Sequence, residues 1–287
     1  MADLFAKDSI IRRVNAEPAI MFGAGRALLL QLAHPAVAQG VADHSDFQHN
    51  PFQRLLGTLE ATVSVVFGSE ELAAGIGRRI HWIHEHVVGP EYRANDPDNL
   101  LWVHATLLDS ARSCYERLVR PLSAEEAATF YEEMTVVAEV FGCPRSAQPA
   151  GPAEFEAWFA ATVDEIRITD TGRALARDIV APKLPLKLHV PLAPQLWLHR
   201  LVAIGTTPTP LREQFGFGWD ERRAAQLRRV EAVARASFSV APRPIRVAGT
   251  QLGSVGFRRL AARHVAEFDA KVARRPELRQ AVASSPK

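Results

Sequence analysis

Apolar residues recur every three to four positions along almost the whole chain, and no segment alternates convincingly between apolar and polar residues. This spacing matches the 3.6-residue turn of an α-helix, whereas a half-buried strand shows a period of two. The pattern therefore predicts an all-α protein with about ten helices. Because no segment repeats at a fixed period, we expect a single multi-helix domain over residues 1–287.

Prolines, glycines and capping residues divide the first half of the chain. Pro35 has no amide hydrogen, so we expect it to kink or divide the first helix. Ser69 precedes two glutamates and is expected to cap a later helix. The predicted helices span residues 18–41, 51–67, 69–89, 97–120 and 123–141.

Helical patterns continue in the second half, between segments rich in proline. Residues 144–152 read as a loop inserted between helices of one domain, and residues 182–194 as an irregular passage. We expect the end of the chain, from 274 to 287, to be frayed. The predicted helices here span residues 153–167, 171–180, 195–204, 210–215 and 219–238.

Composition excludes several classes of function. The net charge is +2 and the basic residues are spread along helix faces, so nothing indicates nucleic-acid binding. The two cysteines show no metal-site spacing. The longest uncharged apolar stretch, residues 27–42, is too short and too polar for a membrane span, and the N-terminus lacks the features of a signal peptide. We therefore expect a soluble cytoplasmic protein with no integral membrane segment.

Three histidines fall on apolar helix faces, namely His34, His84 and His104. His84 lies in a histidine-rich stretch, two helical turns after Gly77, and we expect this glycine to leave a gap beside the imidazole. Such a histidine can ligate a flat group, or it can be a core residue that is hydrogen-bonded to a backbone carbonyl. The sequence leaves both interpretations open. Three inward histidines together favour a polar cavity inside the helical body.

A further set of candidate residues lies on the second long helix. Arg54 and Thr58 are four residues apart and share a face, next to the small residue Gly57. This pair could hold a carboxylate. Alternatively, Arg54 is a surface residue and Thr58 bonds to its own backbone.

The kinds of cofactor make different demands on these residues. Zinc could use His81, His84 and His86, but no HExxH motif is present and His86 points away from His84. A di-iron centre would need paired Glu-x-x-His motifs, which the sequence lacks. Haem b needs one axial histidine, apolar walls and partners for its propionates, which His84, Arg54 and Thr58 could supply. The sequence contains neither a GxSxG elbow nor a P-loop.

Four segments in order resemble the DUF2236 family, which includes the mycophenolic-acid pathway oxygenase and the latex-clearing rubber oxygenases. They are AHPAVAQGVADHS from Ala33, Arg54-x-x-x-Thr58, His84-x-x-Val-x-Gly, and Asp96-Pro97 with LWVHAT from Leu101. These motifs fall within residues 24–110.

The resemblance implies a globin-like helical core around haem b, whose iron uses O2 to cleave carbon–carbon double bonds in the rubber oxygenases. His84 takes the place of the proximal ligand and is the expected metal-binding residue, while Arg54 and Thr58 take the places of the pair near the haem. Gly57 stands where some rubber oxygenases carry a lysine that can reach the iron, so we expect the sixth position to be open, water-bound or filled by another residue. His34 and His104 are expected to line the pocket.

The leading hypothesis is therefore a haem b-dependent oxygenase acting on a small apolar or isoprenoid-like substrate, with O2 and an electron donor as further partners. In it, Arg54, Thr58 and His104 serve at the catalytic site, and His84, Arg54, Thr58, His34 and Gly57 surround the cofactor. Two alternatives remain open: a non-catalytic haem- or lipophile-binding protein, and a metal-dependent hydrolase using the histidine-rich stretch. The sequence does not indicate the oligomeric state.

Overall fold

Helices form almost all of the regular structure, as the hydrophobic period predicted. The computed structural model describes residues 2–45, 51–182 and 184–274, and it does not describe the side chains of residues 51–55, 186 and 188. The elements of the first half are α1 (Ile10–Asn15), the 3₁₀ turn η1 (Pro18–Phe22), α2 (Gly23–Ala33), α3 (Pro35–His44), α4 (Pro51–Phe67), α5 (Glu70–Glu85), β1 (Val88–Gly89), β2 (Tyr92–Arg93), α6 (Pro97–Leu118) and α7 (Ala124–Val140).

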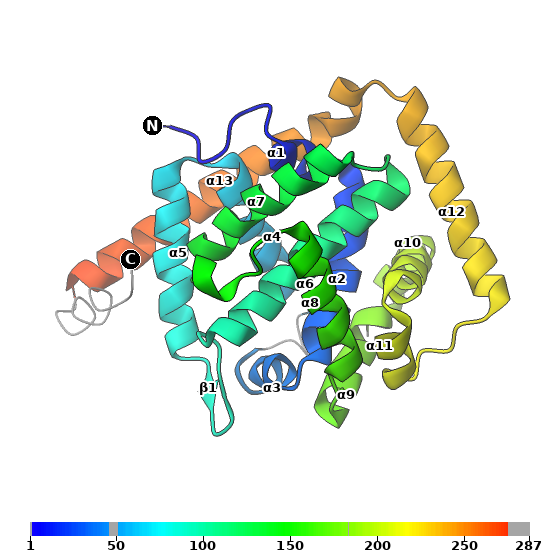
Figure 1. Ribbon diagram of the computed structural model, residues 1–287, viewed down its shortest axis with the longest axis horizontal. Helices are drawn as coiled ribbons and strands as arrows, with labels where there is room; N and C mark the ends of the chain where they lie inside the picture. The colour runs from blue at the N-terminus through cyan, green and yellow to red at the C-terminus, as the bar shows by residue number, and fades with distance from the viewer. Residues whose placement is uncertain (1, 46–50, 183, 275–287) are drawn as a thin grey trace.

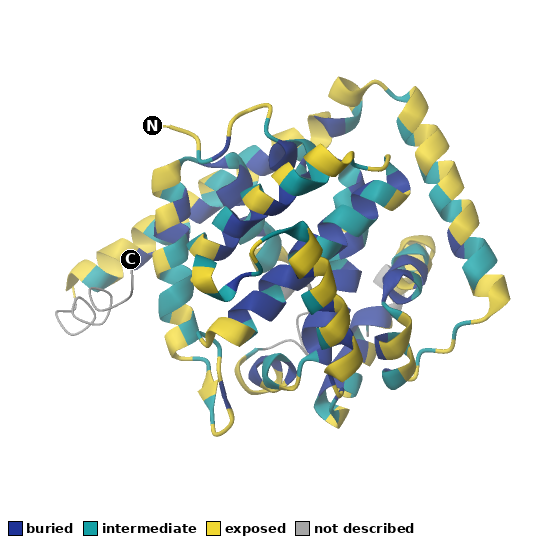
Figure 2. Ribbon diagram, in the orientation of Figure 1, coloured by how far each residue is buried: buried dark blue, intermediate teal, exposed yellow. Residues whose placement is uncertain are grey.

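The second half is also helical. Its elements are the 3₁₀ turn η2 (Arg145–Ala147), α8 (Pro152–Glu165), α9 (Asp170–Val180), α10 (Leu186–Thr206), α11 (Thr209–Gln214), α12 (Glu221–Val240) and α13 (Arg243–Arg274). In Figure 1, α6 and α7 cross the middle of the molecule, α12 runs along the right-hand edge, and α13 passes behind toward the left. Buried residues are concentrated in α2 and α6, whereas α12 is largely exposed (Figure 2).

Local signals predicted several helix boundaries correctly. Pro35 divides the first long helix into α2 and α3. The hydroxyl of Ser69 accepts a hydrogen bond from the amide of Leu72 and so caps α5. Ser123 and Glu126 form a reciprocal capping box at the start of α7. These boundaries depend on residues within one turn, which the sequence displays directly.

Two boundaries differ from the prediction. The helix expected to reach Gly89 ends at Glu85, and the following residues form a small antiparallel hairpin instead. A Cβ at Gly89 would lie 2.3 Å from the ring of Tyr92, so the hairpin needs a residue without a side chain there. The passage expected to be irregular contains the first turns of α10, including Pro191 and Pro194. Because this part of α10 is exposed, water can solvate the carbonyls that the prolines leave without an amide donor.

α13 has no counterpart among the predicted helices. Its buried residues are Val247, Ser254, Ala261 and Phe268, spaced seven apart along 32 residues. Two of the four are small, so the apolar stripe is narrow and produces little hydrophobic periodicity. The helix nevertheless packs against α4, α5 and η1.

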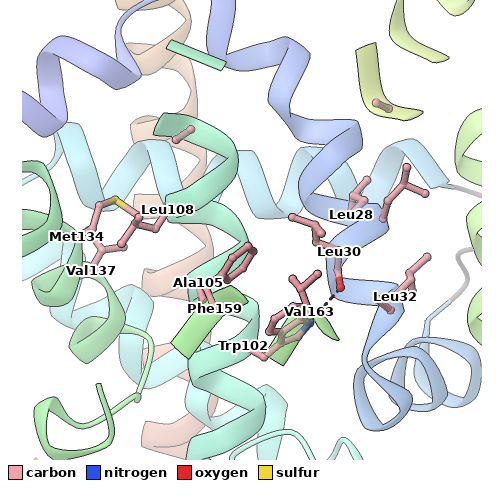
Figure 3. Packing of buried hydrophobic residues seen from close by; sticks show 14 of the residues in the cluster. Leu28, Leu30, Leu32, Trp102, Ala105, Leu108, Met134, Val137, Phe159 and Val163 are labelled. Atoms are coloured by element: carbon pink, nitrogen blue, oxygen red, sulfur yellow. Dashed lines mark hydrogen bonds between the residues drawn. The ribbon is translucent and has the colours of Figure 1, made fainter. Parts of the chain in front are cut away.

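α2 lies at the centre and packs against α6, α9 and α10. Ten of its eleven residues are buried, so small residues are needed where neighbouring helices approach. A Cβ at Gly25 would lie 2.6 Å from the ring of His199 on α10. At the other end, the indole of Trp102 on α6 donates to the carbonyl of Leu30, 3.0 Å away (Figure 3).

No single helix in the described residues is both long and apolar enough to cross a membrane. Residues Pro18–Ala33 and Pro35–His44, bent by 102° at the break, meet the length and composition requirement only when they are counted together. Most of the first of these segments is buried inside the protein.

A buried ion pair attaches α13 to the rest of the protein. Glu17, at the start of η1, is 1% exposed and accepts two hydrogen bonds from the guanidinium of Arg246, at 2.6 and 2.7 Å. The half-exposed Arg243 lies 3.6 Å from the same carboxylate. A planar guanidinium is suited to such a bidentate contact.

We expect Arg246→Ala to lower the free energy of unfolding by about 3 kcal/mol, because it leaves a buried carboxylate without its main partner. Arg243→Ala is the matched control and should cost less than about 1 kcal/mol, since that side chain is solvated. Urea denaturation followed by circular dichroism measures both. Equal losses in the two variants would show that the bidentate pair is not the dominant contact.

Candidate functional site

Predicted site residues line two of the cavities, and the larger of these two lies between α2, α4, α6 and α13 and has a volume of about 340 Å³. Its walls are mostly apolar and include Leu28, Val63 and Phe257. A few polar side chains also line it, among them Thr58 of α4 and Gln31 of α2. An apolar cavity of this size with few polar groups is typical of a small-molecule site.

The smaller cavity has a volume of about 270 Å³ and lies between α3, α5, α6 and the hairpin. His84 and Val87 line it from the end of α5. Tyr92 lines it from β2 and donates a hydrogen bond to the carboxylate of Asp43, 2.8 Å away. Burial and this hydrogen bond raise the pKa of Tyr92 to about 12, so the phenol keeps its proton at neutral pH.

One face of α6 lines both cavities. Leu100 and Val103 line the smaller cavity, and Leu107 and Ala111 line the larger one. His104 lies between these pairs in the helix and is 5% exposed. Neither of its ring nitrogens has a hydrogen-bond partner within the described part of the chain. A buried polar group normally has a partner, so the imidazole of His104 is a site at which a ligand or water molecule could bind.

Burial lowers the pKa of His104 to about 4. The pKa is lowered because removing a cation from water is unfavourable, so burial disfavours the charged form of the imidazole. At neutral pH the ring is therefore uncharged, with one nitrogen able to donate a hydrogen bond and the other able to accept one.

His34 occupies the corresponding position between α2, which lines the larger cavity, and α3, which lines the smaller one. It has an extended backbone and serves as the N-cap residue of α3. Its Nδ1 is buried and has no hydrogen-bond partner among the described residues. Burial lowers the pKa of His34, and Asp98 partly offsets this effect. His34 and His104 are thus a partly buried and a fully buried imidazole, each on a helix segment whose neighbouring residues line these cavities.

The other predicted site residues are divided between the two cavities. His84 is half-buried and lines the smaller cavity, whereas Thr58 lines the larger one. Gly57 is exposed, and a Cβ there would meet no described atom within 4 Å. The prediction for the side chain of Arg54 falls outside the described residues, although its backbone belongs to α4.

The remaining histidines of the histidine-rich stretch have other partners. His86 donates from Nδ1 to the carbonyl of Trp82, 2.8 Å away. The ring of His81 lies 3.5 Å from the carboxylate of Glu85. Across the described ranges, no three histidine, cysteine or acidic side chains are grouped closely enough to hold a metal ion. The three histidines of this stretch therefore do not form the cluster that a zinc hydrolase would require.

The gap expected beside Gly77 is filled. A Cβ at this position would lie 2.5 Å from the carbonyl oxygen of Val140 at the end of α7. Gly77 therefore permits a close approach of two helices and does not widen a ligand pocket. Helical spacing predicted which helix face lacks a side chain at Gly77, but it did not predict that α7 packs against that face.

Comparison with known proteins assigns most of the chain to a family. Residues 11–236 match the family described as the ER-bound oxygenase mpaB/B′/rubber oxygenase catalytic domain. The chain belongs to this family. The match covers most of the chain and includes His34, Thr58, His84 and His104. No curated protein and no solved structure matches the chain.

Two parts of the site were missed by sequence reasoning. Gln31 was read only as a polar interruption of an apolar stretch, yet it is 3% exposed and lines the larger cavity of this oxygenase-family domain. α13 supplies a wall of that cavity and lies beyond the matched residues. A glutamine inside a continuous apolar run is a sequence signal that could have identified Gln31.

We expect His104 to make stability depend on pH. Its folded pKa of about 4 lies below the value of 6.5 for an unfolded histidine, so the unfolded chain binds more protons between these values. The contribution of His104 to stability is therefore fully present above pH 6.5 and is lost as the pH falls toward 4.

His104→Leu should abolish this contribution, which amounts to about 3 kcal/mol across the window. Urea denaturation at pH 4.5, 5.5, 6.5 and 7.5 tests this, with the pH 7.5 values correcting for any change in packing. Parallel pH profiles for the wild-type and variant proteins would contradict the assignment of a buried, neutral imidazole.

Proposed function

We propose that this member of the oxygenase family is a haem b-dependent enzyme that uses O2 to oxidise a small apolar or isoprenoid-like molecule. The observation that carries the proposal is the buried imidazole of His104, whose two ring nitrogens have no partner in the described residues, on a helix whose neighbouring residues line two largely apolar cavities. The family match supports the oxygenase reaction class.

The residues present fit the demands of haem b. An axial imidazole beside an apolar cavity is available in His84. The apolar walls of both cavities would cover the macrocycle or the substrate. By resemblance to the family motif, Arg54 and Thr58 of α4 would hold the propionates. Arginine and a hydroxyl are suitable donors for carboxylates.

When bound, the haem iron would supply the chemistry of O2 activation. The chain would supply the surroundings of that reaction. His84 would hold the iron through its imidazole, and Gly57 adds no side chain that could act as a ligand. The larger cavity would bind the apolar substrate and exclude water. His104, as a neutral imidazole, would donate or accept one hydrogen bond at the boundary of the two cavities.

The two alternative functions make different predictions. A non-catalytic haem or lipophile carrier would use the same cavities but would not consume O2. A hydrolase using His81, His84 and His86 is less well supported, because His86 and His81 contact Trp82 and Glu85. The globin-like arrangement, the single-domain organisation, the electron donor and the cytoplasmic location stay predictions.

The first experiment is an absorption spectrum after haem reconstitution. We expect the wild-type protein to show a Soret band, and His84→Ala to lose it or shift it, because the axial nitrogen is removed. His86→Ala is the matched control, since its ring is exposed and contacts a backbone carbonyl of its own helix. Haem uptake that is the same in all three proteins would contradict His84 as the ligand.

The second experiment separates an oxygenase from a carrier. With reconstituted protein, we expect O2 consumption to depend on an added apolar alkene, and to fall at least tenfold in His104→Leu at unchanged haem content, because that residue carries the unpaired imidazole between the parts of α6 that line the two cavities. An O2 electrode together with mass spectrometry of carbonyl products measures this. Stable haem binding without substrate-dependent O2 uptake would favour the carrier.

A further inference from the structure

The larger cavity opens along α13, which lies outside the residues that match the family. Gly249 and Gly253 line the cavity and are exposed, so the opening passes these two glycines. A Cβ at either position would meet no described atom within 4 Å. Met21 of η1 also lines the cavity and is exposed. The entrance is therefore formed by η1 together with a helix that lies outside the matched residues.

Several polar groups that line the cavity already have partners within the protein. Asn15 donates to the carbonyl of Ile11, and Ser254 donates to the carbonyl of Gln251. Glu17 is paired with Arg246. These contacts leave few polar atoms to recognise a ligand, and they leave no charged side chain free on the described wall of the cavity.

Four polar side chains of the cavity wall form no hydrogen bond with the described residues, and Gln31 is the buried one among them, because Thr58, Thr62 and Thr250 are partly exposed. Gln31 is 3% exposed, lines the cavity, and forms no hydrogen bond with the described residues. Its amide can donate two hydrogen bonds and accept two. A buried amide without a partner is unfavourable, so a ligand oxygen that pairs with it would add both affinity and orientation. Because the amide is neutral, it suits an uncharged group better than a carboxylate or phosphate.

We infer that the larger cavity binds an uncharged, elongated apolar molecule that carries one hydroxyl or carbonyl oxygen. The amide of Gln31 holds that oxygen, and the apolar part extends between α2, α4 and α6 toward the opening at Gly249 and Gly253. The inference rests on the proposed function in taking this cavity as the substrate chamber. It goes beyond that function, because it predicts that the substrate carries a hydroxyl or carbonyl oxygen and that Gln31 recognises this oxygen.

The test measures binding and does not require turnover. Purified full-length protein is loaded with the uncharged fluorophore N-phenyl-1-naphthylamine, which is then displaced with geraniol or with its hydrocarbon counterpart 2,6-dimethylocta-2,6-diene. We expect wild type to bind geraniol about three- to tenfold more tightly than the hydrocarbon, and Gln31→Leu to abolish this preference. Gln39→Leu is the control, because that glutamine is exposed on α3 and bonds to Asp43.

A second pair of variants tests the entrance. Gly253→Leu should weaken the binding of both competitors more than tenfold, because its side chain extends into the opening. Gly256→Leu is the matched control: this glycine also lies on α13 with free space around it, but it does not line the cavity. Thermal unfolding confirms that each variant is folded.

The inference is overturned if wild type binds the two competitors equally or binds neither, or if Gln31→Leu keeps the preference. Equal effects of Gly253→Leu and Gly256→Leu would overturn the assigned entrance. Failure of haem reconstitution would contradict the proposed oxygenase function but would leave this displacement result unaffected, so the two failures are distinguishable.

Discussion

The position of α2 is the constraint on which the rest of the structure depends, because a helix buried on nearly every side has no water to solvate its polar groups. Its last carbonyls have no amide partners within the helix, and the indole of Trp102 supplies a donor to Leu30. Arg26, also buried, forms an ion pair with Asp109 and donates to the carbonyl of Thr206 on α10. These contacts fix α6 and α10 against α2.

The same requirement makes the unsatisfied groups informative. Trp102 and Arg26 show that this interior generally pairs its polar atoms. Ring nitrogens of His34 and His104 depart from that rule among the described residues, and both residues belong to helix segments whose neighbouring residues line the two cavities. An unfavourable buried group is tolerated where a ligand completes it, so these departures mark the functional region. The same requirement, that a buried polar group has a hydrogen-bond partner, explains both the hydrogen bonds of the core and the expectation that a ligand or water molecule binds the unpaired ring nitrogens.

α13 contributes to the larger cavity although it lies outside the residues that match the family. The family match ends at residue 236, yet the following helix covers α4 and completes the larger cavity. It is attached through a narrow line of contacts spaced seven residues apart and through the buried pair of Glu17 and Arg246. A single helix with small residues at its contact points can thus close a cavity and leave an opening in it.

The sequence by itself determined the all-α class, many helix boundaries and the family, because helical period, capping and the motif residues are local features of the chain. It also identified His104 as a residue on an apolar helix face. Only the tertiary structure decided that Gly77 faces α7, that Gln31 lines a cavity, and that His84 and Thr58 belong to different cavities. The physical reason is that periodicity records which face of a helix avoids water, but it does not record which other segment, or which empty space, covers that face.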